Sequence, residues 1–397
     1  MVSTRVTDRP RLVAIRAEAL FDGVSSTLVP EPLLVMDGPS IVSVDVAVAP
    51  PPGAEVVDLG GATLLPGLID THVHLAFDGS DDPVAALAGR DDSAALAAMS
   101  AAGRAALRGG VTTVRDLGDR DYLSLGLRGA RDLPTIVAAG PPITTPAGHC
   151  HFLGGATEPT PQALRAAVRE RADRGVDIIK VMASGGTMTP GTRQETSQFT
   201  AELLRVVVDE AHRLGLPVTA HAHATAAIRM GLDAGVDGME HVSFWSADGV
   251  DDPGDLVSRI ADSRVAVGIT GGAVPTPGAV PPPAVAMRMP RIIANTRRLY
   301  EAGVNLIFGT DAGIGLPKPH DVLRFALEQS AMIGVAPEVA LSLATSRAAA
   351  VCGLGDIKGR LAPGFDADVV AVNGNPLADL AALHRIRAVF ARGIQIA

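Results

Sequence analysis

Cysteine, aromatic residues and positive charge are scarce in this sequence, and each shortage excludes a class of protein. Two cysteines in 397 residues, Cys150 and Cys352, cannot form a disulfide framework, so a reducing cytoplasm is expected. The formal net charge is −9 without a basic stripe, which argues against nucleic acid as a partner. No segment reaches the roughly 18 consecutive apolar residues of a membrane-spanning helix. No membrane partner is therefore expected, and no signal peptide either, because residues 1–10 lack the apolar core of one.

The remaining composition is that of a folded α/β protein. Hydrophobic residues make up 47% of the chain and charged residues 19%, which excludes disorder. Alanine, valine, leucine and glycine supply the excess, whereas aromatic residues are only 3%. The chain is long enough for one large domain and a smaller one.

Strand-like segments alternate with helical patterns through the middle of the chain. The expected strands cover residues 64–74, 112–116, 135–139, 177–182, 217–223, 238–242, 265–269 and 305–311. The expected helices cover residues 92–107, 161–174, 201–214, 225–234, 290–302, 321–332 and 337–350. Eight strands alternating with helices over roughly 250–290 residues predict an α/β fold of the (β/α)8 TIM-type barrel. A doubly wound open sheet is the alternative.

Both ends of the chain read as short strands broken by turns. Residues 11–62 and 355–397 each hold too few strands for independent stability, so we expect them to pair as a small composite β-sandwich. Residues 63–354 would then form the barrel. The segment 271–289, rich in proline, glycine and methionine, follows the seventh strand and is expected to be either a lid or an ordered Ω-loop.

The first barrel strand carries two histidines at its far end. His72 and His74 are two residues apart, so both imidazoles point to the same side of a strand. Apolar residues on either side indicate a strand buried on both faces, where a histidine pair needs partners. Neutral imidazole is the commonest protein ligand for zinc-like metals. A metal site is therefore favoured over two polar residues on a solvated edge.

Further polar residues fall at or near the ends of other strands, where barrel active sites are built. Lys180 lies between Ile179 and Val181, and a desolvated lysine loses its charge readily. His241 and Asp311 lie near the ends of two more strands. Six of the ten histidines occur in His-x-His pairs, at 72/74, 149/151 and 221/223. Such clustering favours metal binding and catalysis over scattered core histidines.

This combination resembles the amidohydrolase superfamily of metal-dependent hydrolases, and the resemblance covers the whole chain. The matching residues are PGLIDTHVH at 66–74, Lys180, His221, His241 and GTD at 309–311. Within the superfamily, GVTTVRDLG at 110–118, IKVMASGG at 179–186 and HAH at 221–223 are similar to the Xaa-Pro dipeptidase and carboxypeptidase-like subgroup. GRLAPGFDAD at 359–368 is similar to the family's re-entry into the sandwich.

The resemblance implies a binuclear centre with two divalent ions, zinc being favoured and manganese, cobalt or iron being alternatives. Its ligands would be His72, His74 and Asp311 for the more buried ion, His221 and His241 for the other, and a CO2-derived carbamate on Lys180 as the bridge. A hydroxide between the ions would attack the substrate, and Asp311 would pass its proton to the leaving nitrogen. His223 would donate to the scissile carbonyl.

Five residues are candidates for substrate binding: His149, His151, Arg115, Trp245 and Arg193. In relatives, a histidine in the loop after the third strand contacts the substrate's carboxylate, and His149 matches it best. His151 is alternatively a residue that orders this loop. Arg115 is alternatively a brace under the site, and Trp245 alternatively a packing residue.

The leading hypothesis is a hydrolase that cleaves an amide bond in a small substrate with a free carboxylate, such as an Xaa-Pro dipeptide or an N-acyl amino acid. The alternative is a hydrolase or deaminase of the same fold that acts on a cyclic amide or amidine. A non-catalytic scaffold is disfavoured because all the predicted metal ligands are intact. Cationic anchoring of a carboxylate would discriminate, with Arg193, Arg288 and Arg291 as candidates. A homo-oligomer is expected.

Overall fold

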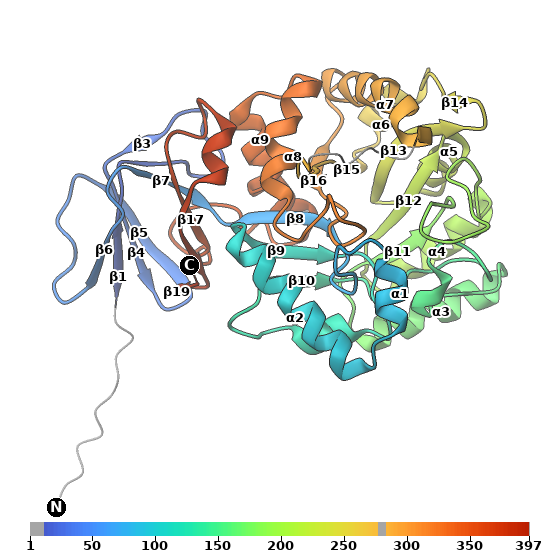
Figure 1. Ribbon diagram of the computed structural model, residues 1–397, viewed down its shortest axis with the longest axis horizontal. Coiled ribbons are helices and arrows are strands. Elements are labelled where there is room, and N and C mark those ends of the chain that lie inside the picture. Colours follow the sequence, from blue (N-terminus) through green and yellow to red (C-terminus); the bar gives the residue numbers. More distant parts are fainter. Residues whose placement is uncertain (1–11, 277–282, 397) are drawn as a thin grey trace, which may run out of the picture. The chain divides into compact units, whose positions relative to one another are not determined.

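The structure is a computed structural model that describes residues 12–276 and 283–396 (Figure 1). It divides into two compact units. The first contains the residues up to Ile69, Gly110–Thr112 and the residues from Pro337 on, and the second contains Asp70–Gly109 and Thr113–Ala336. The first unit thus includes residues 337–354, which the sequence analysis expected in the barrel. The predicted domain boundaries stay predictions.

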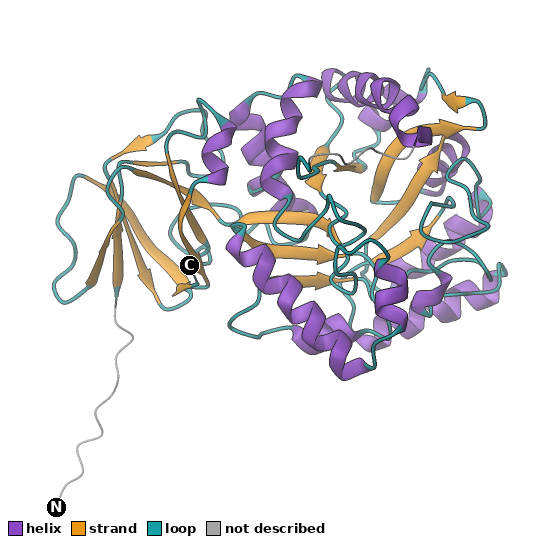
Figure 2. Ribbon diagram, in the orientation of Figure 1, coloured by secondary structure: helices purple, strands orange, loops and turns teal. Residues whose placement is uncertain are grey.

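Two β-sheets make up most of the first unit (Figure 2). One has the order β5-β4-β1-β6 and consists of β1 (Val13–Arg16), β4 (Pro32–Asp37), β5 (Ser40–Val46) and β6 (Glu55–Asp58). The other has the order β19-β18-β17-β7-β2-β3 and consists of β2 (Ala19–Leu20), β3 (Val29–Pro30), β7 (Ala62–Pro66), β17 (Val369–Asn373), β18 (Ile386–Ala391) and β19 (Ile394–Gln395). Strand β17 pairs with β7, and Ser40 forms a bridge with Asp366. Strands from both ends of the chain therefore lie in one sheet.

The strand predicted at residues 64–74 is interrupted at Gly67, so it forms two strands, β7 and β8 (Leu68–Val73). The amide of Gly67 donates to Asp368 O, whereas the next amide, of Leu68, donates to Gly110 O. The chain thus changes its pairing partner within one residue. A Cβ at Gly67 would lie 2.0 Å from Thr112 Oγ1, so no larger residue fits this crossing.

Apolar side chains of both sheets meet in one buried cluster. It contains Ile15, Leu34, Met36 and Ile41 from the first sheet, and Leu20, Leu64, Val369 and Phe390 from the second. Burial of each large apolar side chain contributes about 1.5–3 kcal/mol. The same unit holds helices α9 (Pro337–Leu343) and α10 (Ser346–Val351). One helix was predicted here, but Thr345 has φ −133° and ψ −100°, which interrupts it.

Parallel strands alternate with helices in the second unit, and all eight predicted strands of the middle region are present. Strands β8, β9 (Val111–Asp116) and β10 (Thr135–Ala138) form one sheet. The other sheet contains β11 (Ile179–Met182), β12 (Val218–Ala224), β13 (Gly238–Ser246), β15 (Ala266–Thr270) and β16 (Leu306–Gly309), with β14 (Gly249–Val250) paired to β13. Isolated parallel bridges join Val73 to Ala312 and Ile143 to Val181.

Local capping explains where several helices begin and end. The helices of this unit are α1 (Pro83–Ala88), α2 (Asp92–Arg108), α3 (Pro161–Arg174), α4 (Ala201–Arg213), α5 (Thr225–Ala234), α6 (Leu256–Asp262), α7 (Pro283–Glu301) and α8 (Leu323–Gln329). The side chains of Asp91, Thr160 and Thr200 accept from first-turn amides of α2, α3 and α4. Gly175 and Gly235 end α3 and α5 in the left-handed conformation. Within the described residues, no helix is long and apolar enough to cross a membrane.

Helix α7 corrects the expected loop at 271–289. It begins at Pro283 rather than at Pro290, which lies inside the helix. Proline lacks an amide hydrogen and usually marks a helix start, which is why the sequence suggested the later boundary. Arg288 Nε donates to Gly249 O, and Asn295 Nδ2 donates to Asp251 O, so side chains anchor both parts of the helix. Residues 277–282, at the centre of the expected loop, lie outside the described residues.

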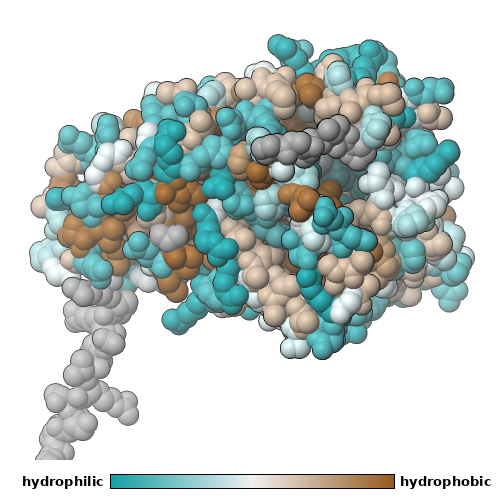
Figure 3. All heavy atoms as spheres, in the orientation of Figure 1, coloured by the Kyte–Doolittle hydropathy of each residue, from teal (hydrophilic) through white to brown (hydrophobic). Residues whose placement is uncertain are grey.

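We expect Phe390→Ala to lower the free energy of unfolding by about 3–5 kcal/mol, because it opens a cavity in the cluster between the two sheets. Val42→Ala serves as the control. Hydrophobic side chains reach the surface beside hydrophilic ones on the face that Figure 3 shows. Val42 is 45% exposed, so its truncation should change the stability by no more than about 0.5 kcal/mol. Urea unfolding followed by circular dichroism measures both. Equal midpoints for the two variants would contradict the assigned core.

Candidate metal centre

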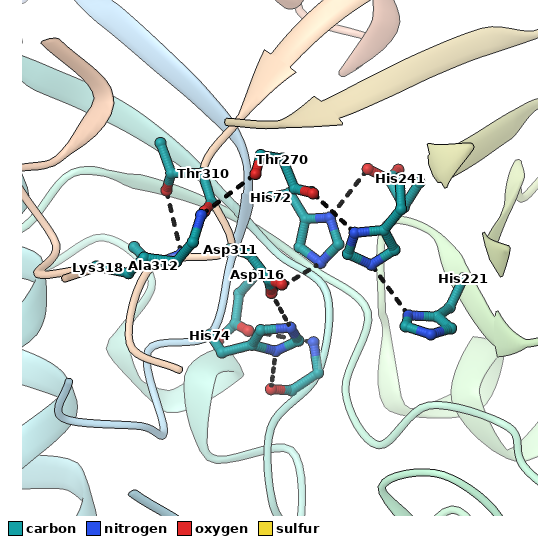
Figure 4. A network of polar contacts seen from close by, with 12 residues as sticks. His72, His74, Asp116, His221, His241, Thr270, Thr310, Asp311, Ala312 and Lys318 are labelled. Carbon is teal, nitrogen blue, oxygen red and sulfur yellow. Dashed lines mark hydrogen bonds and ion pairs between the residues drawn. The ribbon is translucent and has the colours of Figure 1, made fainter. Parts of the chain in front are cut away.

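Five histidines and one aspartate form two groups at the ends of parallel strands. Figure 4 shows all of them except His223. The first group is His72, His74 and Asp311, and the second is His221, His223 and His241. Within each group, one nitrogen or oxygen atom of every residue lies within 4.8 Å of the others. The rings of His72 and His241, one from each group, have centroids 5.3 Å apart. The two groups are therefore neighbours in one site.

Hydrogen bonds orient the two histidines of the first group. Nδ1 of His72 lies 3.0 Å from Glu240 Oε2, and Nδ1 of His74 lies 3.1 Å from Gly118 O. An acceptor at Nδ1 keeps the proton there and leaves the lone pair of Nε2 free for a metal. Both Nε2 atoms face Asp311 Oδ1, at 3.5 Å from His72 and 3.2 Å from His74. These three atoms thus present a ready set of metal ligands.

The second group is oriented in the same way. His221 Nε2 lies 3.1 Å from Gly185 O, and His241 Nδ1 lies 2.7 Å from Thr270 Oγ1. The remaining nitrogens, His221 Nδ1 and His241 Nε2, are 3.0 Å apart. Two nitrogens at about 2.05 Å from a tetrahedral zinc ion would be separated by about 3.3 Å. The pair therefore fits two ligands of a single ion.

Two of the predicted ligands have a left-handed backbone. His241 has φ 74° and Asp311 has φ 61°. A non-glycine residue in this region costs on the order of 1–3 kcal/mol and persists where the surroundings fix it, often at functional sites. Near His241, the pairing of β12 with β13 shifts register between Ala222 and Ala224. The irregular backbone turns these ligands away from the ordinary strand direction.

Lys180 is a buried residue whose amine is left without a hydrogen-bond partner among the described residues. Its side chain is 1% exposed. Burial lowers the pKa of Lys180 to about 8. An unpartnered buried ammonium is costly, whereas a neutral amine can accept a carboxyl group or face a metal. The residues of this site fit a metal centre with Lys180 as a further ligand.

Glu240 was not predicted as a site residue, but it contacts the predicted ligand His72. It is 1% exposed, and Oε1 accepts from Arg115 Nη2 at 2.9 Å and from Thr219 Oγ1 at 2.7 Å. Burial opposes ionisation, but Arg115 and His72 more than offset it, so the pKa of Glu240 lies well below its usual range. The available signal was an acidic residue inside an apolar strand, directly before His241.

Asp70 was quoted in the motif but received no role, and it joins two ligand-bearing segments. Its Oδ1 accepts from the amides of His72 and Thr310, at 3.2 and 3.0 Å. Its Oδ2 accepts from the Thr310 hydroxyl at 2.6 Å. Asp70 therefore fixes the end of β8 against the residue that precedes Asp311.

The structure places three of the five substrate-binding candidates near the ligands, with different surroundings. The Arg115 guanidinium is buried and donates to Thr71 O and Glu240, which is the position of a brace. The buried ring of His149 lies 4.8 Å from that of His221, and its Nδ1 has no partner in the described part of the chain. Trp245 is also buried, with its ring 6.1 Å from His223.

The other two candidates make only local contacts. Nδ1 of His151, an exposed residue, lies 2.9 Å from Gly148 O in its own loop. The side chain of Arg193 is 68% exposed and pairs with Glu195. The structure does not bring either side chain into the ligand groups.

His223 lies beside the second group. Its ring stacks on His241 at 4.1 Å, and its Nδ1 lies 2.7 Å from Ser243 Oγ. The grouping with His221 and His241 means that His223 has the geometry of a ligand as well as that of a hydrogen-bond donor.

The comparison with known families decides the identity. A family model described as the amidohydrolase family matches residues 63–395, most of the chain. The chain belongs to the amidohydrolase family. This amidohydrolase is an enzyme that hydrolyses C–N bonds and has the TIM-barrel-type fold with a parallel sheet that its relatives share. Its family is generally metal-dependent, in agreement with the two ligand groups.

Relatives place it near the dipeptidase-like members. It is 29% identical over 377 residues to the ochratoxinase of Aspergillus niger, which covers 82% of this chain and 73% of that protein. It is 25% identical over 340 residues to the imidazolonepropionase of Geobacillus kaustophilus, covering 81% of this chain and 77% of that protein. A crystal structure of an Xaa-Pro dipeptidase with bound methionine in the active site aligns with a TM-score of 0.82 and 26% identity, covering 97% and 99% of the two chains.

We expect Glu240→Gln to weaken metal binding about 10–100-fold, because the amide removes the charge that holds the His72 proton at Nδ1. Glu210→Gln is the control, since Glu210 lies in helix α4 and pairs there with Arg169 and Arg213 instead of a predicted ligand. Chelator competition followed by elemental analysis measures both variants. Wild-type affinity in the Glu240 variant would refute the role of this carboxylate.

Proposed function

We propose that this amidohydrolase is a binuclear metal-dependent hydrolase of small amides that carry a free carboxylate. Xaa-Pro dipeptides and N-acyl amino acids are the substrate classes. The observation that carries the proposal is the pair of neighbouring ligand groups in the same unit as the unpartnered amine of Lys180. The similarity to an Xaa-Pro dipeptidase supports the peptidase-like direction.

We also infer that the eight parallel strands close into a (β/α)8 barrel and that the terminal sheets form a composite β-sandwich. The bridges from Val73 to Ala312 and from Ile143 to Val181 support the barrel, because they continue the pairing beyond both sheets. The apolar cluster shared by the two terminal sheets supports the sandwich.

The proposed ligands divide between two ions. They are His72, His74 and Asp311 for one, His221 and His241 for the other, and a carbamate on Lys180 for both. Zinc suits these ligands, and manganese, cobalt or iron could occupy the same set. When bound, such ions would lower the pKa of a water molecule and polarise a carbonyl group.

The protein's own residues would move the proton and bind the substrate. Asp311 would accept a proton from the attacking water and deliver it to the leaving nitrogen. His223 would donate from Nε2 to the carbonyl oxygen if the Ser243 hydroxyl donates to Nδ1, which the 2.7 Å contact allows. The unpartnered Nδ1 of buried His149 would contact the substrate's carboxylate.

A second candidate is a hydrolase or deaminase that acts on a cyclic amide or amidine. The similarity to an imidazolonepropionase favours it. The two candidates differ in their need for a cation that binds a carboxylate. Neither Arg193, paired with Glu195, nor Arg291, paired with Asp252, is free of a carboxylate partner.

A substrate panel separates the two candidates. The enzyme is prepared with zinc or manganese and bicarbonate, and products are followed by mass spectrometry with Xaa-Pro dipeptides, other dipeptides, N-acyl amino acids and cyclic amides. We expect cleavage of the amides with a free carboxylate. Turnover of the cyclic amides alone, with two ions bound, would instead establish the second candidate.

Asp311→Asn should lower kcat by at least about 10²-fold, because the amide cannot accept the proton, while the histidines retain much of the metal. Asp321→Asn is the control: Asp321 pairs with Arg324 and is not a predicted ligand. Steady-state kinetics and metal content are measured for both. Full activity in the Asp311 variant would exclude its role as the proton shuttle.

A further inference from the structure

Lys318 lies in the loop after β16 and has no role in the ligand set. Its Nζ donates to three main-chain carbonyls, at 2.6 Å to Thr310, 3.2 Å to Thr270 and 3.3 Å to Gly271. Figure 4 labels Lys318 with Thr310 and Thr270. An ammonium group has three donors and no acceptor, so these three bonds satisfy it. The carbonyls lie at the ends of β15 and β16, which lead into the metal centre.

The loop is shaped to bring Lys318 back to these strand ends. Gly313 N donates to Lys318 O at 2.8 Å, and Lys318 N donates to Gly315 O at 2.9 Å. Gly313 has φ +100°, and a Cβ there would lie 2.6 Å from His74 O. Only glycine fits this turn. The position of the ammonium is therefore fixed by the backbone around it.

The first contact of Lys318 bears on Asp311. Thr310 directly precedes Asp311, whose φ of 61° is unfavourable for a residue with a side chain. Lys318 binds the Thr310 carbonyl, and the Asp311 amide of the same peptide group donates to His72 O at 2.8 Å. In the next peptide group, the Ala312 amide donates to Thr310 Oγ1 at 3.1 Å, so both peptide groups that flank the strained residue are held.

The second contact bears on the other ligand group. The carbonyl of Thr270 accepts from Lys318, while the hydroxyl of the same residue lies 2.7 Å from His241 Nδ1. One ammonium therefore reaches a ligand of each group, through the backbone of Asp311 and through the partner of His241. In the described part of the chain, no carboxylate lies within ion-pair distance of Lys318, in contrast to Lys358, which pairs with Asp366 and Asp368.

We propose that Lys318 is a positioning residue that couples the two halves of the metal centre. This inference rests on the proposed function, because it assumes that both groups bind ions. The ammonium holds Asp311 and Thr270 at a fixed separation, so that the first group and His241 are placed for their ions together. A residue that served only to tie two loops would affect stability and leave metal binding unchanged.

The test is Lys318→Met, whose unbranched side chain is one atom shorter than that of lysine and lacks all three donors. We expect about a 10–100-fold loss of affinity for both ions, as is typical when groups that orient ligands are removed. Chelator competition gives the affinities, and the ligand-field spectrum of the cobalt-loaded protein reports a change in coordination. Circular dichroism checks that the variant is folded. If it is not folded, Lys318→Gln, which keeps two donors, is measured in the same way.

Two further variants serve as matched controls. Lys358→Met removes another buried lysine, in the first unit, and should lower the melting temperature while metal affinity stays at the wild-type level. Thr270→Val removes the hydroxyl and keeps the carbonyl, so it should weaken only the ion held with His241. A folded Lys318 variant with two ions at wild-type affinity and an unchanged cobalt spectrum would overturn the proposal. If the wild-type protein itself binds fewer than two ions, the proposed function fails instead.

Discussion

The metal centre depends on one buried group, the carboxylate of Glu240, and on its contacts with neighbouring strands. From β13 it binds His72 of β8, Arg115 of β9 and Thr219 of β12. On β15, a Cβ at Gly268 would lie 2.1 Å from Glu240 Oε2, so only glycine leaves room for this carboxylate. Five strands are thus adapted to one side chain. Removing one partner of such a buried pair typically costs 3–5 kcal/mol, because it leaves a charge without compensation.

The ends of these parallel strands carry the residues of the candidate metal centre. Parallel strands deliver their last residues to one end of a barrel, so ligands that are far apart in the sequence become neighbours. Hydrogen bonds at the second nitrogen of four predicted histidine ligands determine which nitrogen faces a metal. Two of the predicted ligands, His241 and Asp311, join their groups with a backbone in the strained left-handed conformation. Lys180, whose amine has no protein partner in the described region, supplies a further position for chemistry.

The strands, and the grouping of the paired histidines with His241 and Asp311, could be predicted because their signals are local. Alternating patterns, and histidines two residues apart, need no knowledge of the rest of the chain. The roles of Glu240 and Lys318 depend on partners in distant segments, which spacing alone does not indicate. Other boundaries were wrong because they depend on distant segments: the amides of Gly67 and Leu68 pair with different parts of the chain, and α7, which continues through Pro290, binds the carbonyls of Gly249 and Asp251. Two substrate-binding candidates, His151 and Arg193, make only local contacts in the structure, and the roles of all five stay predictions.

The most direct test of the account is a crystal structure of the zinc- or manganese-loaded enzyme grown with bicarbonate, with anomalous scattering recorded at the metal edge. The account predicts two anomalous peaks, one between His72, His74 and Asp311 and the other beside His221 and His241. It also predicts density for a carboxyl group on Lys180 between them. A single ion held by the three histidines of the second group, with an unmodified Lys180, would contradict it.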